Sequence, residues 1–374
     1  MIIAVNTKCP PGEFFDGIED FVLSCITRLA NHHPQHHFII ITNTKFEQKI
    51  ISSKNITSVV AGPLSNSPLL WQIWHQYKLP AVLKKYKADV FISANGMLSF
   101  RSKIPQTLLL PSLAFIQHPK LFGKKYLRLY TALTPNFLAK ANAVLVFSTP
   151  VKDYIIDHFS VNKQKINIIS NFAGAVFYPF NAYQQEKVKE KYTAGKAYFL
   201  FPGHLSESSN LLNLLKAFSF FKKRQKTNML LVIAQTAITN DTAFDNAFKT
   251  YKFRNEVIRI TDTAPEVIAQ LTAAAYALVY PVLADYLCSP LFQAMQCGTP
   301  VICSNGDSAA AYCGNAALYV NPGDINDIAE KMMLLFKDEN KCKELGHAGK
   351  INAVHFTIDH SARQLWQSLS GTIK

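Results

Sequence analysis

The sequence lacks the features that mark membrane-spanning, secreted and disulfide-stabilised proteins. No run of about 18 or more apolar residues occurs in its 374 residues, so we expect no membrane-spanning segment. The seven cysteines are odd in number and form no CxxC pair, which argues against a disulfide framework, a zinc site and a redox motif. The apolar N-terminal run is cut off by Pro10 and Pro11 before it reaches the length of a signal peptide. These absences predict a protein of the reducing cytosol.

Acidic residues are few compared with basic ones. The chain has 25 Asp and Glu against 39 Lys and Arg, a formal net charge of +14. Such an excess favours an anionic partner, which could be a nucleotide-bearing substrate, an anionic membrane surface or nucleic acid. The alternative is a solvated surface that is merely rich in lysine. No nucleic-acid-recognition motif is present, so we expect no nucleic-acid partner. Hydrophobic residues make up 49% of the chain, enough to fill the cores of two domains at this length.

Short apolar runs alternate along the chain with longer segments of helical period. Continuous apolarity is typical of parallel strands covered on both faces, and the alternation predicts an α/β protein with doubly wound parallel sheets. The first half contains these expected strands and helices: Ile2–Val5, Phe38–Ile41, Val90–Ile92, Thr107–Leu110 and Val144–Phe147; Ile18–Ala30, Leu69–Lys85 and Tyr126–Ala139. The second half contains these: Tyr198–Phe201, Leu230–Ala234, Val257–Ile260, Ala277–Tyr280 and Val301–Cys303; Leu211–Phe221, Pro265–Ala275, Leu291–Gln296 and Ile325–Phe336.

A linker separates the two sets of elements. The segment Asn171–Tyr183 is rich in aromatic residues, glycine and proline, and it precedes a charged helix at Gln184–Tyr192. We therefore place the domains at residues 1–175 and 176–355, followed by a C-terminal helix within 356–374. Two doubly wound domains joined by one linker are expected to face each other, with ligands at the carboxyl ends of their strands.

Several segments resemble the motifs of one enzyme family. Tyr280–Val301 reads YPVLADYLCSPLFQAMQCGTPV and is similar to a stretch in which a glutamate, seven residues and a second glutamate precede AMACGTPV. Gly314–Asp324 (GNAALYVNPGD) is similar to GDAALYVDPGD, and Gly203–Asn210 (GHLSESSN) lies where the family has GRLxxxKG. Asp16–Glu19 (DGIE) opens the first long helix, as the family's glycine loop does. The chain resembles the retaining glycosyltransferases of family 4, also called group 1, which have the GT-B fold of two Rossmann-like domains.

This resemblance implies a reaction and a role for each of the two domains. The family moves a hexose from a nucleotide-diphosphate sugar to a glycan or lipid-linked acceptor with retention at the anomeric carbon. The resemblance implies that the N-terminal domain holds the acceptor, that the C-terminal domain holds the donor, and that the last helix crosses back to the N-terminal domain. It implies no cofactor and no metal, and the sequence offers no DxD motif for one.

The resemblance also assigns roles to particular positions. It implies a catalytic carboxylate near the donor sugar at Asp285, and it implies donor-binding residues at these positions: Gly17, His204, Ser209, Pro290, Leu291 and Gln293. His204 and Ser209 replace an arginine and a lysine, whose fixed positive charges stabilise the departing diphosphate. Gln293 replaces the second glutamate, which binds ribose hydroxyls, and Cys288 replaces a glycine.

Besides other two-domain enzymes of this shape, such as phosphorylases or nucleotide-sugar epimerases, these substitutions leave two functions open. The first is an active, metal-independent glycosyltransferase of polysaccharide biosynthesis whose donor site is altered. The alternative is a catalytically inactive homologue that binds a glycan or serves as the partner subunit of an active glycosyltransferase, because neither His204 nor Ser209 is a fixed positive charge.

The basic segment Lys120–Tyr130 has two interpretations as well. Its lysines and arginine are interleaved with aromatic and aliphatic residues, a pattern that suits a helix docked on an anionic membrane face. A solvated helix with a buried apolar side is the alternative. The first interpretation predicts a cytoplasmic protein that associates peripherally with the inner membrane face.

Overall fold

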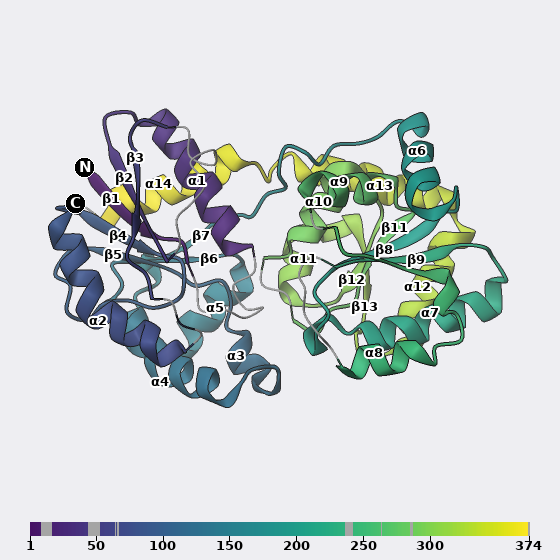
Figure 1. Ribbon diagram of the computed structural model, residues 1–374, viewed down its shortest axis with the longest axis horizontal. Helices are drawn as coiled ribbons and strands as arrows, with labels where there is room; N and C mark the ends of the chain where they lie inside the picture. Colours follow the sequence, from purple (N-terminus) through teal and green to yellow (C-terminus); the bar gives the residue numbers. More distant parts are fainter. Residues whose placement is uncertain are drawn as a thin grey trace. The chain divides into compact units, whose positions relative to one another are not determined.

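The computed structural model describes residues 1–8, 17–43, 53–63, 65, 67–235, 242–262, 264–284 and 287–372. The chain divides into two compact units (Figure 1), which comprise Met1–Asn171 with Ile358–Lys374, and Phe172–Thr357. The units divide within the segment that the sequence marks as a linker. Each unit has its own parallel sheet with helices packed against it, and this confirms the predicted α/β class with two doubly wound, Rossmann-like sheets.

The first unit contains a seven-stranded parallel sheet with the order β3-β2-β1-β4-β5-β6-β7. Its central strands are continuously buried because helices cover both faces. Two edge strands, β3 and β7, were not expected from the sequence. The strands are β1 Ile2–Asn6, β2 His37–Thr42, β3 Ile56–Val60, β4 Val90–Ser93, β5 Gln106–Leu109, β6 Ala143–Val146 and β7 Ile166–Ile168.

The helices of the first unit include the last helix of the chain. This helix, α14, lies along α1 (Figure 1): Asp359 pairs with Arg28, and the Trp366 ring stacks on His33 with 3.9 Å between ring centroids. The Ser361 hydroxyl donates to the Ser170 carbonyl at 2.6 Å. The described helices are α1 Ile18–His32, α2 Pro68–Lys85, α3 Ala114–Gln117, α4 Lys124–Lys140, α5 Thr149–His158 and α14 Ile358–Thr372.

The second unit contains a six-stranded parallel sheet with the order β10-β9-β8-β11-β12-β13. Its strands are β8 Tyr198–Gly203, β9 Leu230–Gln235, β10 Val257–Ile260, β11 Ala277–Tyr280, β12 Val301–Ser304 and β13 Ala317–Val320. Its described helices are α6 Ala182–Thr193, α7 Leu211–Gln225, α8 Thr242–Lys249, α9 Pro265–Ala274, α10 Ser289–Cys297, α11 Asp307–Cys313, α12 Ile325–Lys337 and α13 Glu339–Ala353.

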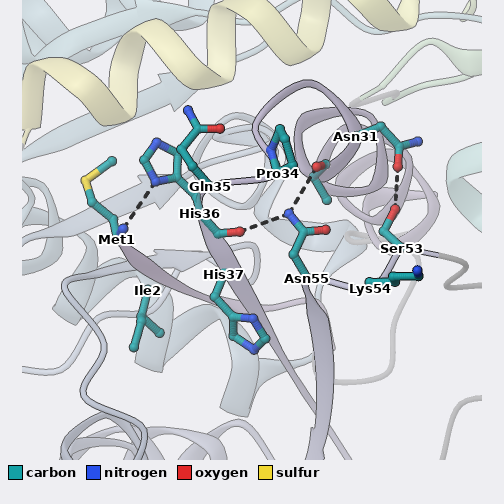
Figure 2. A pocket seen from close by; sticks show the side chains of 11 residues that line it. Met1, Ile2, Asn31, Pro34, Gln35, His36, His37, Ser53, Lys54 and Asn55 are labelled. Carbon is teal, nitrogen blue, oxygen red and sulfur yellow. Dashed lines mark hydrogen bonds between the residues drawn. The ribbon is translucent and has the colours of Figure 1, made fainter.

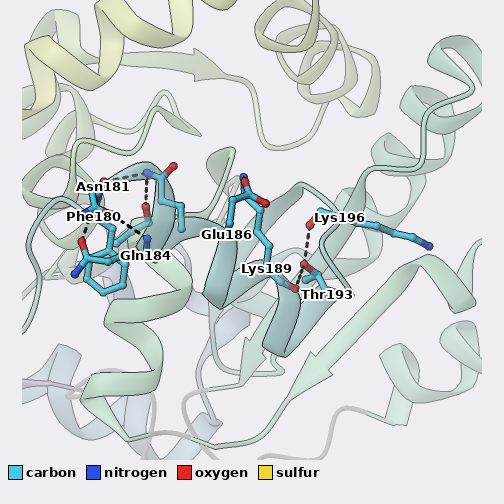
Figure 3. Close-up of polar contacts among 9 residues, drawn as sticks. Phe180, Asn181, Gln184, Glu186, Lys189, Thr193 and Lys196 are labelled. Carbon is cyan, nitrogen blue, oxygen red and sulfur yellow. Dashed lines mark hydrogen bonds and ion pairs between the residues drawn. The ribbon is translucent and has the colours of Figure 1, made fainter.

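Helix α6 opens the second unit and is fixed at both ends (Figure 3). At its start the Asn181 side chain accepts a hydrogen bond from the Gln184 amide at 2.9 Å, and the Gln184 side chain accepts one from the Asn181 amide at 3.0 Å. This capping box satisfies two backbone donors that a helix start leaves unpaired. At its end the Thr193 hydroxyl donates to the Lys196 carbonyl at 2.6 Å, which closes the turn into β8.

Aromatic side chains connect the sheet and helices in the core of the second unit. Phe199 on β8 and Phe221 on α7 meet edge to face, with 5.2 Å between their ring centroids, and both are fully buried. Phe221 also meets Phe336 of α12 at 5.4 Å, so one ring joins the sheet to two helices. Its neighbour Phe220 points outward and is 39% exposed.

The two adjacent phenylalanines of α7 provide a matched test of this packing. We predict that Phe221→Ala lowers the free energy of unfolding by about 3–5 kcal/mol, because it removes a buried ring and leaves a cavity. Phe220→Ala changes helix propensity by the same amount but removes an exposed ring. Its effect on the free energy of unfolding should therefore stay within about 0.5 kcal/mol. Urea unfolding of the full chain measures both. Equal effects would contradict the assigned orientation of α7.

Candidate functional site

The order of the strands in the second sheet reverses between β8 and β11. Open α/β sheets bind ligands at such a point, outside the carboxyl ends of the strands, because the connections there diverge to opposite faces. The segment Gly203–Asn210 begins at the last residue of β8 and forms the loop after it, and the loop after β11 leads from Pro281 into α10. The two loops touch: the Leu283 amide donates to the Ser208 carbonyl at 2.8 Å. The segments that carry the resemblance therefore meet at the switch point.

Hydroxyl groups determine the shape of the β8 loop. The Ser206 hydroxyl lies 2.9 Å from that of Ser208 and 3.0 Å from that of Ser209. The Ser209 hydroxyl donates to the His204 carbonyl at 2.6 Å, and Ser209 is only 6% exposed. Ser209, predicted as a donor-binding residue, is thus engaged within its own loop. His204 is half-buried and lies at the start of the loop.

Asn210 joins this loop to two others. Its side-chain amide donates to the Pro281 carbonyl at 2.8 Å and to the Pro322 carbonyl at 2.7 Å. The residue is 7% exposed, and its backbone is left-handed, with φ 58°. Glycine and asparagine are the residues that adopt this conformation most readily, which explains why asparagine stands where the resembled loop has glycine. One side chain therefore connects the loops that follow β8, β11 and β13.

Helix α10 presents the other predicted donor-binding residues. Pro290 lies in its first turn and is half-buried, as is Gln293. Leu291 is fully buried, so its side chain belongs to the core. Cys288, immediately before the helix, is left-handed with φ 52°, although it has a side chain. A glycine would adopt this backbone without strain, in agreement with the glycine of the resembled motif.

The predicted site residues fall into three groups. His204 and Ser209 lie on the β8 loop, and the contact of that loop with Leu283 places it beside the segment that leads to Pro290, Leu291 and Gln293. Asp285 lies outside the described residues. Gly17 belongs to the first unit, where it precedes α1 with φ 75°.

The buried cysteines near the site belong to the core. Cys288, Cys297 and Cys303 are at most 5% exposed. Burial raises the pKa of the Cys297 thiol to about 12, so this thiol stays protonated and unreactive near neutral pH. Within the part of the chain that the structure describes, no group of three or more His, Cys, Asp or Glu side chains is placed to hold a metal ion.

Two contacts near the site were not anticipated from the sequence. The first is the Asn210 bridge. The sequence feature that could have indicated it is that Asn210 stands where the resembled motif has a glycine. The second involves Gln296, which stands where the resembled motif AMACGTPV has its second alanine. Its side chain donates to the Phe177 carbonyl at 2.7 Å, which ties α10 to the linker segment of the same unit.

A separate cavity of about 710 Å³ lies in the first unit (Figure 2). Its walls include Met1, Ile2 and His37, at the amino ends of β1 and β2, and Asn55, whose side chain donates to the His36 carbonyl at 2.9 Å. The cavity therefore opens at the edge of the sheet opposite to the carboxyl ends. It contains none of the predicted donor-binding residues.

Comparisons with known proteins agree with the geometry. The family model described as "Glycosyl transferases group 1" matches residues 183–351, and the one described as "Glycosyltransferase Family 4" matches residues 15–173. The O-antigen chain mannosyltransferase B of Escherichia coli is 22% identical over 360 residues, which cover 93% of this chain and 94% of that protein.

Solved structures share the fold at low sequence identity. Sucrose-phosphate synthase from Thermosynechococcus elongatus superposes with a TM-score of 0.80 at 16% identity, covering 99% of this chain and 98% of that one. Anabaena HepE, solved in complex with UDP-glucose, superposes with a TM-score of 0.77 at 16% identity, covering 99% of each chain.

The Asn210 bridge can be tested with a variant that preserves the backbone. We predict that Asn210→Gly lowers the free energy of unfolding by about 2 kcal/mol, because the buried Pro281 carbonyl loses its donor and the half-buried Pro322 carbonyl keeps only the long contact with Asn213, while glycine retains the left-handed conformation. Asn213→Ala is the control, since the Asn213 amide reaches the Pro322 carbonyl only at 3.4 Å. Urea unfolding measures both variants. A smaller loss for Asn210→Gly than for Asn213→Ala would refute the bridge.

Proposed function

We propose that this protein transfers a hexose with retention from a nucleotide-diphosphate sugar to a glycan or lipid-linked acceptor. The chain belongs to the group 1 and family 4 glycosyltransferases, which have the GT-B fold. The observation that carries the proposal is the meeting of the β8 loop and the segment before α10 at the switch point of the second sheet. The mannosyltransferase name of the Escherichia coli relative favours mannose as the hexose. The UDP-glucose held by Anabaena HepE supports a nucleotide sugar as the donor class.

The donor would lie against the start of α7. As the glycosidic bond breaks, negative charge develops on the departing diphosphate, and the backbone N–H groups and dipole of a helix N-terminus stabilise it. Helix α7 begins at Leu211, directly after the bridge that fixes Asn210, so its first turn is held in place. Because Ser209 is engaged with the His204 carbonyl, this helix start and the His204 ring would carry most of the stabilisation.

Gln293 and Asp285 complete the proposed donor site. Gln293, half-buried on the second turn of the helix, would hydrogen-bond a ribose hydroxyl through its amide. Asp285 would place its carboxylate near the donor sugar, as the family resemblance implies. No residue in this proposal requires a metal ion or another cofactor.

A second candidate function is that of a catalytically inactive homologue. The observation that favours it is the absence of lysine and arginine from Gly203–Asn210, the loop next to the proposed diphosphate position. In this case the fold would serve as a glycan-binding or partner subunit of an active glycosyltransferase. Activity with nucleotide sugars separates the two candidates.

Transfer activity is the direct test. We predict that the protein converts a nucleotide-diphosphate mannose and an oligosaccharide acceptor into a mannosylated product whose anomeric configuration, measured by NMR, equals that of the donor. Asp285→Asn should lower kcat about 100-fold or more, because it removes charge near the reacting carbon. Donor binding without transfer, across a panel of nucleotide sugars and acceptors, would favour the inactive homologue.

The β8 loop supplies a further prediction about the donor. His204→Arg should tighten nucleoside diphosphate binding by about tenfold or more, because a hydrogen bond to a charged group contributes about 1.5–3 kcal/mol. His204→Gln is the neutral control and should bind no more tightly than the unmodified protein. Isothermal titration calorimetry measures all three proteins. An unchanged affinity for His204→Arg would place the diphosphate away from this loop.

A further inference from the structure

The cavity of the first unit lies far along the chain from the residues of the proposed donor site (Figure 2). Its walls come from the end of α1, the starts of β1 and β2, and the segment that precedes β3. The volume of about 710 Å³ falls within the range of about 300–1,000 Å³ that is typical of sites for small molecules. The cavity therefore has room for one small ligand.

The Asn55 side chain holds the walls of this cavity in place. Its amide group donates to the carbonyls of Ala30, His33 and His36 at 3.0, 3.3 and 2.9 Å. These carbonyls lie at the end of α1 and in the turn that follows it, where a helix leaves acceptors unpaired. Because the fold itself makes these contacts, a ligand would enter a cavity whose shape is already fixed.

Amide groups at the cavity offer hydrogen bonds that the fold does not use. The Ser53 hydroxyl donates to the side-chain oxygen of Asn31, which leaves the NH2 group of Asn31 for other contacts (Figure 2). Among the described residues, neither this NH2 group nor the Gln35 side chain has a hydrogen-bond partner, and both residues are exposed. A primary amide can both donate to and accept from a hydroxyl group, so these positions suit a ligand that is rich in hydroxyls.

Lys54 gives the cavity a fixed positive charge. It is exposed and forms no ion pair with a described residue, and none of the residues that line the cavity is an aspartate or a glutamate. The Asp89 carboxylate next to Ile2 is engaged, since it accepts a hydrogen bond from the Ile2 amide at 2.7 Å. Asp359 of α14 pairs with Arg28. The cavity therefore favours an anionic group beside Lys54.

His36 connects the cavity to helix α14. The Met1 amino group donates to Nδ1 of His36 at 3.2 Å, and the His36 ring stacks on Trp366 with 5.2 Å between ring centroids. Burial, the Met1 amino group and His33 lower the pKa of His36, so its ring is neutral near pH 7 and acts as a hydrogen-bonding group. Because α14 begins where the chain returns from the second unit to the first, a ligand that contacts His36 also affects this return segment.

We infer that the cavity binds a phosphorylated monosaccharide as a second ligand, distinct from the donor. The Lys54 ammonium group binds the phosphate, and the amides of Asn31 and Gln35 bind the sugar hydroxyls. No phenylalanine, tyrosine or tryptophan lines the cavity, so it has no ring on which a nucleobase would stack. Contact with His36 holds that ring against Trp366, so binding stabilises the docked position of α14. The inference does not depend on glycosyl transfer.

Isothermal titration calorimetry of the full chain tests the ligand class. Mannose 6-phosphate or glucose 6-phosphate should bind saturably with one site per chain, and inorganic phosphate or the free sugar should bind at least about tenfold more weakly. Lys54→Gln should weaken hexose phosphate binding by about tenfold or more, because it removes a charge-assisted hydrogen bond, whereas Lys54→Arg should retain binding. The control is Lys163→Gln, which removes an exposed lysine before β7, the other edge strand of the same sheet, and should bind like the unmodified protein.

Tryptophan fluorescence tests the connection to α14. The chain has three tryptophans, and Trp71 and Trp74 are buried on α2, so a change caused by the hexose phosphate should come from Trp366. Trp366→Phe keeps an aromatic ring in the stack. This variant should bind the hexose phosphate in calorimetry but lose the fluorescence change.

Several outcomes would overturn the inference. These are no saturable binding of either hexose phosphate, and equal affinity of Lys54→Gln and the unmodified protein. Inorganic phosphate that binds as tightly as the hexose phosphates would remove the sugar from the proposed ligand. A fluorescence change that persists in Trp366→Phe would contradict the connection to α14. Lys54→Gln should leave nucleoside diphosphate affinity unchanged, and a joint loss of both affinities would refute a cavity separate from the donor site.

Discussion

The buried amide of Asn210 is the contact on which the geometry at the carboxyl edge of the second sheet depends. Its two N–H groups bond the carbonyls of Pro281 and Pro322, and neither carbonyl belongs to the ladder of a neighbouring strand. Loops at the carboxyl ends of parallel strands leave the sheet in different directions, so each needs a tertiary contact to keep its place. A left-handed residue with a short amide side chain supplies both the sharp turn into α7 and the two donors. The start of α7 is held by this contact.

The strands that could be predicted from the sequence are those whose apolarity is continuous. Val257–Ile260 and Ala277–Tyr280 begin and end where the sequence placed them. In β3, Ile56–Val60, three of the five residues are exposed at the sheet edge, so its mixed pattern resembles a loop. In β7 only three residues pair, below the length at which a pattern is visible. Strand β13 was noticed as a family motif rather than as a strand, because Ala317–Val320 is short and only partly buried.

The elements that carry His204 and Ser209 could be predicted, but the partners of their side chains could not. Motif resemblance placed His204 and Ser209 on a loop between a strand and a helix, and the structure has them there. That the Ser209 hydroxyl turns back to its own loop depends on the backbone path, which residue identity does not specify. The same holds for Gln296, whose bond to the Phe177 carbonyl joins groups 119 residues apart in the chain. Side-chain hydrogen bonds of this kind appear only once the tertiary fold is known.

The distribution of charge differs between the two units. The net charge of +14 suggested either a nucleotide substrate or an anionic membrane, and the sequence alone did not separate these. The three loops joined by Asn210, residues 203–210, 281–288 and 321–324, contain no lysine or arginine, whereas residues 67–152 contain twelve. In the proposed function, diphosphate stabilisation at this edge would therefore come from a helix start and neutral donors, which act only at close range. Most of the net charge of the chain, and with it most of the long-range field, arises instead from the first unit.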